Sequence, residues 1–149
     1  MSMEPMEPLV DLLKTLAHPA RLRILAVLRD GELCVCQINA VVGLAPSTVS
    51  EHLTELRRAG LLSERKDGRW VYYKLKPKRS LLEMVEVLWK YLDKTRPVHD
   101  DRKRALSVRM APVDLVCSQN KSNNMYIKSM QGDKAIRREH PDRADVSVD

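Results

Sequence analysis

The chain has 149 residues, of which 44% are apolar, so a single domain with a modest hydrophobic core is expected. The N-terminal MSMEPMEP has prolines and acids where a signal peptide needs an apolar run, and no stretch reaches the roughly 18 apolar residues of a membrane span. Three cysteines are an odd number for a disulfide framework, which indicates a cytoplasmic protein whose thiols stay reduced, with no membrane partner.

The positive charge is concentrated in one segment. Residues 57–79 contain nine Lys or Arg against two acids, Glu64 and Asp67, so their surplus of +7 exceeds the +6 of the whole chain. A local basic strip is typical of a surface that contacts nucleic-acid phosphates. The alternative, a lysine-rich solubilising surface, is disfavoured because such charge is usually mixed along the chain.

Two short helices are expected first. After a frayed arm of residues 1–8, leucines at helical spacing predict an amphipathic helix over residues 9–16. The Ala17-His18-Pro19 context ends that helix, because a residue before proline avoids the α conformation. A second helix is expected over residues 20–29, and Asp30-Gly31 then signals a turn.

A third helix is predicted over residues 32–42, and a three-residue turn, Gly43-Leu44-Ala45, connects it to a recognition helix over residues 45–60. One face of the recognition helix is apolar, with residues recurring at i, i+4 and i+7 from Val49. The other face carries short hydrogen-bonding groups, namely Ser47, Thr48, Ser50, Glu51, His52 and Thr54. On its own this pattern also fits an ordinary surface helix. Two helices joined by a short glycine-containing turn predict a helix-turn-helix.

A β-hairpin is expected directly after this unit. Residues 61–66 lead into Asp67-Gly68, a strong hairpin turn, and residues 69–75 form a β-branched and aromatic return strand. The predicted fold is therefore mainly α with a β-hairpin wing (α+β), a winged helix-turn-helix. The wing would place Arg65, Lys66 and Arg69 along DNA phosphates or in the minor groove.

Residues 80–95 are expected to form a helix that is apolar almost all round. Its apolar side chains, Trp89 and Leu88 among them, exceed what one face can bury against so small a domain. We therefore expect a homodimer whose interface combines this helix with the helix over residues 9–16.

The chain is expected to divide into a DNA-binding and dimerisation domain, residues 1–95, and a mostly disordered tail, residues 96–149. The tail lacks hydrophobic periodicity and is rich in polar and charged residues. A short strand around Leu106–Met110 is the one element considered there.

Four segments in a single order resemble the ArsR/SmtB family of arsenical-resistance and metal-sensing repressors. They are LAHPARLRIL (16–25), ELCVCQI (32–38), STVSEHLTELRRAGLL (47–62) and DGRWVYYKL (67–75), and the resemblance covers roughly residues 9–95. It implies a homodimeric repressor that binds double-stranded operator DNA at an inverted repeat and releases it when an ion binds. By position it assigns DNA reading to Ser47, Thr48, Ser50 and His52, and leaves open whether Glu51 tunes base choice or repels phosphate.

The ELCVC segment resembles the arsenite-sensing box of that family. Thiolates are soft ligands, so the resemblance implies As(III) or Sb(III) as inducer, bound by Cys34 and Cys36, with no organic cofactor. A single cysteine is more often a buried core residue, but two at i and i+2 lie about 200° apart on a helix and cannot both face the core. For the same reason, binding both to one ion requires the helix start to unwind, which would move the recognition helix.

The box departs from its best-known version, because Asn39 stands where a third cysteine is usual. Either two thiolates suffice with solvent or another ligand, or Cys117 supplies the third. Ordering a disordered tail costs about 1–2 kcal/mol for each residue fixed, so we expect Cys117 to be dispensable for induction.

Other functions are disfavoured or stay open. An enzyme is disfavoured because the chain has no nucleophile elbow, phosphate loop or paired-carboxylate motif, and no activating histidine near Cys34 or Cys36. A winged helix that binds only proteins is disfavoured by the basic strip. A repressor of the same fold that senses oxidants or another soft metal remains open. A zinc-type site is set aside because residues 80–95 contain no histidine, and His18, His99 and His140 are expected to be solvated.

Overall fold

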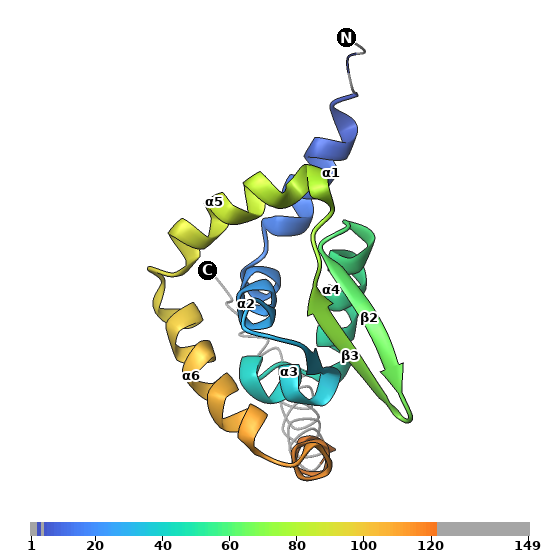
Figure 1. Cartoon of the computed structure of the whole chain (residues 1–149), viewed down its shortest axis with the longest axis vertical. Coiled ribbons are helices and arrows are strands. Elements are labelled where there is room, and N and C mark those ends of the chain that lie inside the picture. The colour runs from blue at the N-terminus through green and yellow to red at the C-terminus, as the bar shows by residue number, and fades with distance from the viewer. Residues whose placement is uncertain (1–2, 4, 122–149) are drawn as a thin grey trace, which may run out of the picture.

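The computed structural model describes residue 3 and residues 5–121, and it adds a short strand and a sixth helix to the predicted elements (Figure 1). They are α1 (Glu7–Leu16), α2 (Pro19–Leu28), β1 (Leu33–Cys34), α3 (Val35–Val42), α4 (Pro46–Arg58), β2 (Leu62–Asp67), β3 (Trp70–Leu75), a 3₁₀ turn (Arg79–Leu81), α5 (Leu82–Leu92) and α6 (Arg96–Met110). Residues 113–121 are also helical. Within the described residues, no helix is both long and apolar enough to cross a bilayer.

The core is built around α2, with α5 and α6 along one side and α4 with the hairpin on the other (Figure 1). The apolar stripe predicted for the recognition helix is confirmed, since Val49, Leu53 and Leu56 are all fully buried. The turn between α3 and α4 depends on Gly43, whose φ of +70° is the left-handed conformation that glycine adopts without strain. Burial on one face of α4 leaves its polar face outward.

The winged helix-turn-helix is confirmed, with one strand more than predicted. The sheet is antiparallel in the order β1-β3-β2, and β3 pairs with both neighbours through Tyr72, which lies opposite Cys34 and Arg65. The hairpin loop is Gly68 and Arg69, since Asp67 still pairs with Trp70.

The predicted helix over residues 32–42 is wrong at its start. Leu33 and Cys34 are extended and pair with β3, and α3 begins only at Val35. The Gln37 side chain accepts a hydrogen bond from the Cys34 backbone N–H at 2.9 Å. This bond gives the N–H at the start of α3 an acceptor, which the backbone of the first helical turn does not provide. Strand pairing and this cap together outweigh the helical pattern of the segment.

The tail prediction is wrong for residues 96–121. Residues 106–110 belong to helix α6, not to a strand, and residues 122–149 lie outside the described residues. Helix α6 packs on the core through Val98, Ala105 and a fully buried carboxylate, Asp101. Sequence reasoning missed this helix because its contact with the core is partly ionic and so carries little hydrophobic periodicity.

Helix α5 buries one face in its own chain and exposes another. Trp89 is only 4% exposed and the guanidinium of Arg29 stacks over it, so Trp89 belongs to the core of its own protomer and not to an interface. The apolar side chains left exposed on α1 and α5 are Leu9, Val10, Leu13, Leu82, Val87 and Tyr91.

Candidate nucleic-acid interface and cysteine site

The polar face of α4 is open to solvent. Ser47, Ser50 and Glu51 are exposed, and Thr48 is partly exposed. These side chains come from the first two turns of α4, so they project from the helix end that enters the DNA major groove in helix-turn-helix proteins. Three of the four residues expected to read DNA therefore share an accessible surface.

His52 does not belong to that surface, which corrects the sequence prediction. Its side chain is buried, its Nδ1 accepts a hydrogen bond from Nε of Arg21 at 3.2 Å, and its ring lies 4.4 Å from the ring of His18. Burial lowers the pKa of His52, and the neighbouring His18 and Arg21 lower it further. We therefore assign His52 to holding α4 against α2.

The expectation that the other histidines are solvated holds only in part. His18 is partly buried, and its Nδ1 accepts a hydrogen bond from the backbone N–H of Ala20, which caps helix α2. His99 is exposed as expected, and His140 lies outside the described residues.

Two of the three predicted wing cations are already paired with carboxylates. Arg65 contacts Glu32 at 2.5 Å, lowering the pKa of that carboxyl, and stacks over the ring of Tyr72. Arg69 contacts Asp114 at 2.5 Å and stacks over the ring of Trp70. Lys66 is exposed and has no ion-pair partner in the described part of the chain.

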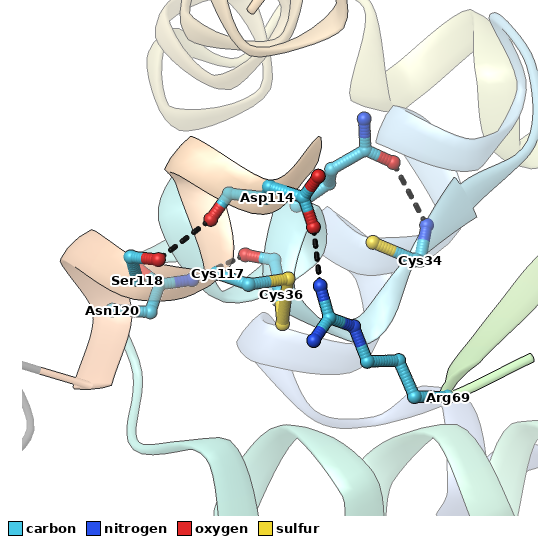
Figure 2. The surroundings of a disulfide bond; sticks show 8 residues. Cys34, Cys36, Arg69, Asp114, Cys117, Ser118 and Asn120 are labelled. Atoms are coloured by element: carbon cyan, nitrogen blue, oxygen red, sulfur yellow. Dashed lines mark hydrogen bonds and ion pairs between the residues drawn. A yellow bond between two sulfur atoms is a disulfide. The ribbon is translucent and has the colours of Figure 1, made fainter. Parts of the chain in front are cut away.

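The cysteines pair differently from the prediction (Figure 2). Cys36, in the first turn of α3, is joined by a disulfide to Cys117, with their Cα atoms 5.1 Å apart. Cys34 is free and buried, in the extended residues before α3. This differs from the expectation that the thiols stay reduced, and it brings Cys36 together with Cys117 and not with Cys34, the predicted second ligand of the ion. The prediction that the start of α3 must unwind to bring Cys34 and Cys36 to one ion does not apply either, because Cys34 lies before the first residue of α3.

The donor set at this site is two sulfur atoms. Among the residues that the structure describes, no three His, Cys, Asp or Glu side chains gather as ligands for a metal ion. When reduced, Cys36 and Cys117 form a dithiol that fits a thiophilic ion through two bonds. The sequence named Cys117 only as a dispensable third ligand, because it lies 81 positions from Cys36 and the intervening helix α6 was not expected.

The comparisons with known proteins agree with this geometry. The profile described as "Bacterial regulatory protein, arsR family" matches residues 18–64, which span α2 to the start of the wing. The transcriptional activator HlyU of Vibrio cholerae is 40% identical over 79 residues, covering 53% of this chain and 72% of HlyU. The chain belongs to the arsR family. A solved structure of HlyU, 38% identical, covers 60% of this arsR-family chain and 97% of HlyU with a TM-score of 0.53.

Two relatives are named for arsenic resistance. The arsenic resistance transcriptional regulator ArsR1 of Pseudomonas putida is 46% identical over 65 residues, covering 43% of this chain and 51% of that protein. The arsenical resistance operon repressor of Escherichia coli is 44% identical over 69 residues, covering 46% and 59%. The arsR-family chain thus spans between half and three fifths of the length of these two relatives. All three relatives are named as regulators, in agreement with the prediction that the chain is not an enzyme.

Proposed function

We propose that this chain is a homodimeric transcriptional repressor that binds double-stranded operator DNA and releases it when As(III) or Sb(III) binds at its cysteines. The observation that carries the proposal is the pair of sulfur atoms at the first turn of α3, the helix that packs against recognition helix α4. An ion bound there changes the position of α3, and with it the position of the DNA-binding helix α4 that packs against α3. The names of the two arsenic-resistance relatives support the choice of inducer.

DNA recognition is assigned to the accessible face of α4 and to the wing. Ser47, Thr48 and Ser50 present hydroxyl groups that donate or accept hydrogen bonds at base edges in the major groove. Arg65, Lys66 and Arg69 supply the charge that attracts phosphates, which strengthens binding without reading sequence.

The dimer is assigned to the apolar side chains that α1 and α5 leave exposed. Burying apolar surface stabilises association by roughly 25 cal/mol per Å², and an isologous interface uses the same patch on both protomers. Two-fold symmetry then presents two α4 helices about one DNA turn apart, which matches an inverted repeat.

The inducer chemistry needs no oxidant. Arsenous acid carries three hydroxyl groups, and each thiol that attacks arsenic replaces one of them, so one As–S bond forms, one As–O bond breaks and one water leaves. The reduced dithiol of Cys36 and Cys117 accommodates two such exchanges. Cys34 would have to turn out of its buried position to supply a third sulfur. We therefore now expect Cys117, like Cys36, to be needed for induction.

A gel shift tests this proposal directly. Reduced protein is bound to the DNA upstream of its own gene and titrated with As(III), Sb(III) and Zn(II), and Cys34→Ser, Cys36→Ser and Cys117→Ser variants are compared. Arsenite is expected to release the wild type and to leave Cys36→Ser and Cys117→Ser bound. A Cys117→Ser variant that still dissociates with wild-type sensitivity would remove the tail cysteine from the site. Failure of any thiophilic ion to release the wild type would overturn arsenite sensing.

A second candidate function is favoured by the disulfide itself. A repressor of the same fold can sense oxidants if the linked and reduced forms differ in DNA affinity, and one structure similar to this chain (38% identical, 57% of this chain and 88% of that chain, TM-score 0.51) is titled "Reduced HlyU". Adding peroxide to the same gel shift separates the two functions. Release by peroxide but not by arsenite supports oxidant sensing.

A further inference from the structure

The helical segment of residues 113–121, here called the clasp, touches both the sulfur pair and the wing (Figure 2). The carboxylate of Asp114 contacts Arg69, Cys117 is bonded to Cys36, and Nδ2 of Asn120 donates a hydrogen bond to the Cys36 carbonyl at 2.5 Å. Successive contacts are three residues apart, a spacing that puts neighbouring side chains on one side of a helix. The clasp therefore bridges the start of α3 and the hairpin loop.

We propose that Asp114 is the residue through which the state of the Cys36–Cys117 pair reaches the DNA-binding wing. When the sulfur atoms of Cys36 and Cys117 are joined (the closed link), Asp114 is held in contact with Arg69, and the DNA interface loses one free cation. When they are separate thiols (the open link), Arg69 is available to DNA. This inference rests on the proposed function to the extent that it requires the wing to bind DNA.

The ion pair depends on the link because it is weak by itself. The side chains of Arg69 and Asp114 are 73% and 68% exposed, and a solvated pair of this kind gains little once screening and side-chain entropy are counted. A covalent link three residues away holds the carboxylate close to the arginine, so its effective concentration there is high. When the link opens, the covalent restraint on Asp114 is lost, and the clasp is held by non-covalent contacts such as the buried side chain of Val116 and the Asn120 hydrogen bond.

The pairing matters for DNA because a phosphate and Asp114 compete for the same guanidinium. A phosphate that approaches Arg69 in the closed state must displace a carboxylate and is repelled by it. The Arg65–Glu32 pair does not involve the clasp, so the wing retains its other contacts and the effect on affinity is partial.

Closing the link is a balanced two-electron step. The two thiols form one S–S bond, losing two protons and two electrons, and hydrogen peroxide accepts both and is reduced to two waters. An As(III) ion held by both thiolates joins the same two helices without oxidation. Oxidation by peroxide and binding of As(III) are therefore both expected to hold Asp114 against Arg69.

The experiment measures the affinity of the full chain for a random-sequence DNA duplex, because a phosphate contact is independent of sequence. Wild type, Asp114→Asn and a matched control, Asp67→Asn, are each compared after oxidation with peroxide and after reduction with dithiothreitol. The disulfide is verified by intact mass. Asp67 is a suitable control because it is also an exposed carboxylate beside a wing arginine, 3.6 Å from Arg65. Asp67 belongs to the wing and not to the clasp, so its distance from Arg65 should not depend on the disulfide.

Closing the link in the wild type is expected to weaken DNA binding about two- to fivefold for each wing, the value of one exposed ion pair. The slope of log affinity against log salt should become shallower by about 0.9 for each wing. Asp114→Asn should form the disulfide yet bind equally in both states. Asp67→Asn should bind more tightly in both states and keep the wild-type ratio.

The failures are distinguishable. Equal affinity of linked and open wild type overturns the inference alone. A full response in Asp114→Asn overturns the role of Asp114, because the link then acts by another route. No binding of either state to DNA, even at low salt, overturns the proposed function and the inference together.

Discussion

Arg23 of α2 holds Asp101 of α6 with two hydrogen bonds, Nε to Oδ2 at 2.7 Å and Nη2 to Oδ1 at 2.8 Å. Asp101 is fully buried, and Arg104 donates to the same carboxylate. Both arginines also reach the end of α3, where Arg23 donates to the Val42 carbonyl and Arg104 to the Val41 carbonyl. This network fixes α6 on the helix-turn-helix, and α6 in turn positions the clasp.

Replacing Asp101 by Ala should lower the free energy of unfolding by about 1–3 kcal/mol, because it leaves the partly buried guanidinium of Arg23 without the carboxylate that accepts two of its hydrogen bonds. Urea denaturation followed by circular dichroism measures the loss. Asp100→Ala is the matched control, because the carboxylate of Asp100 lies at the surface and makes a long contact with Arg96, at 3.9 Å. This variant should change the free energy of unfolding by no more than about 0.5 kcal/mol. Equal losses in the two variants would show that the buried network does not fasten α6.

Acidification should destabilise the protein through His52. Because burial and cationic neighbours lower its pKa in the folded state, folding favours the neutral ring. The resulting stability is fully present above the ordinary histidine pKa of about 6.5 and is lost as pH falls from there through the lower folded pKa. His52→Gln should therefore lose less stability than wild type between pH 7.5 and 5.5, measured by thermal unfolding. His18, Arg21 and Glu51 face this ring and are unchanged in the variant, so identical pH profiles would contradict the assignment.

A charge on the exposed face of α5 should dissociate the dimer. Val87→Glu and Tyr91→Glu place a carboxylate where the proposed interface excludes water, and sedimentation equilibrium should then give monomers that bind the operator poorly. Leu106→Glu is the control, because Leu106 is 66% exposed on α6 and outside the proposed interface. Trp89 is unsuitable for this test, since its substitution damages the core of the protomer. A wild type that is monomeric at micromolar concentration would rule out the interface.

Substitutions on α4 should change the preference for operator DNA, and substitutions on the wing should change the affinity for all DNA. Ser50→Ala should reduce preference for the operator over other DNA by roughly 1–3 kcal/mol for each hydrogen bond to a base edge that it removes. Lys66→Ala should weaken binding to all duplexes alike and reduce the salt slope by about 1. Ser107→Ala, an exposed serine on α6, serves as the control. Competition titrations against random DNA measure both effects, and unchanged preference in Ser50→Ala would exclude that serine from base reading.

Apart from β1, the order of elements from α1 to α5 was predictable, because each of the others rests on local signals. The apolar stripe from Val49 defines the buried face of α4, the glycines at 43 and 68 permit turns with positive φ, and the aromatic run after Arg69 favours a strand. The exposed hydroxyl groups of α4 follow from the same periodicity. The burial of His52 does not, because its hydrogen-bonding side chain matches the polar face and only its contact with Arg21 and His18 shows that it points inward.

The winged helix and its family resemblance therefore follow from the sequence alone, since they depend on periodicity, turns and segments that are contiguous in the chain. Three contacts are visible only in the folded chain: Cys36 with Cys117, Asp114 with Arg69, and residues 96–121 with the core. Each of these contacts joins residues that are 45 to 81 positions apart, or buries a charge that looks solvated in sequence. Pairings of this kind leave no local pattern, because their energy comes from partners that only the folded chain brings together.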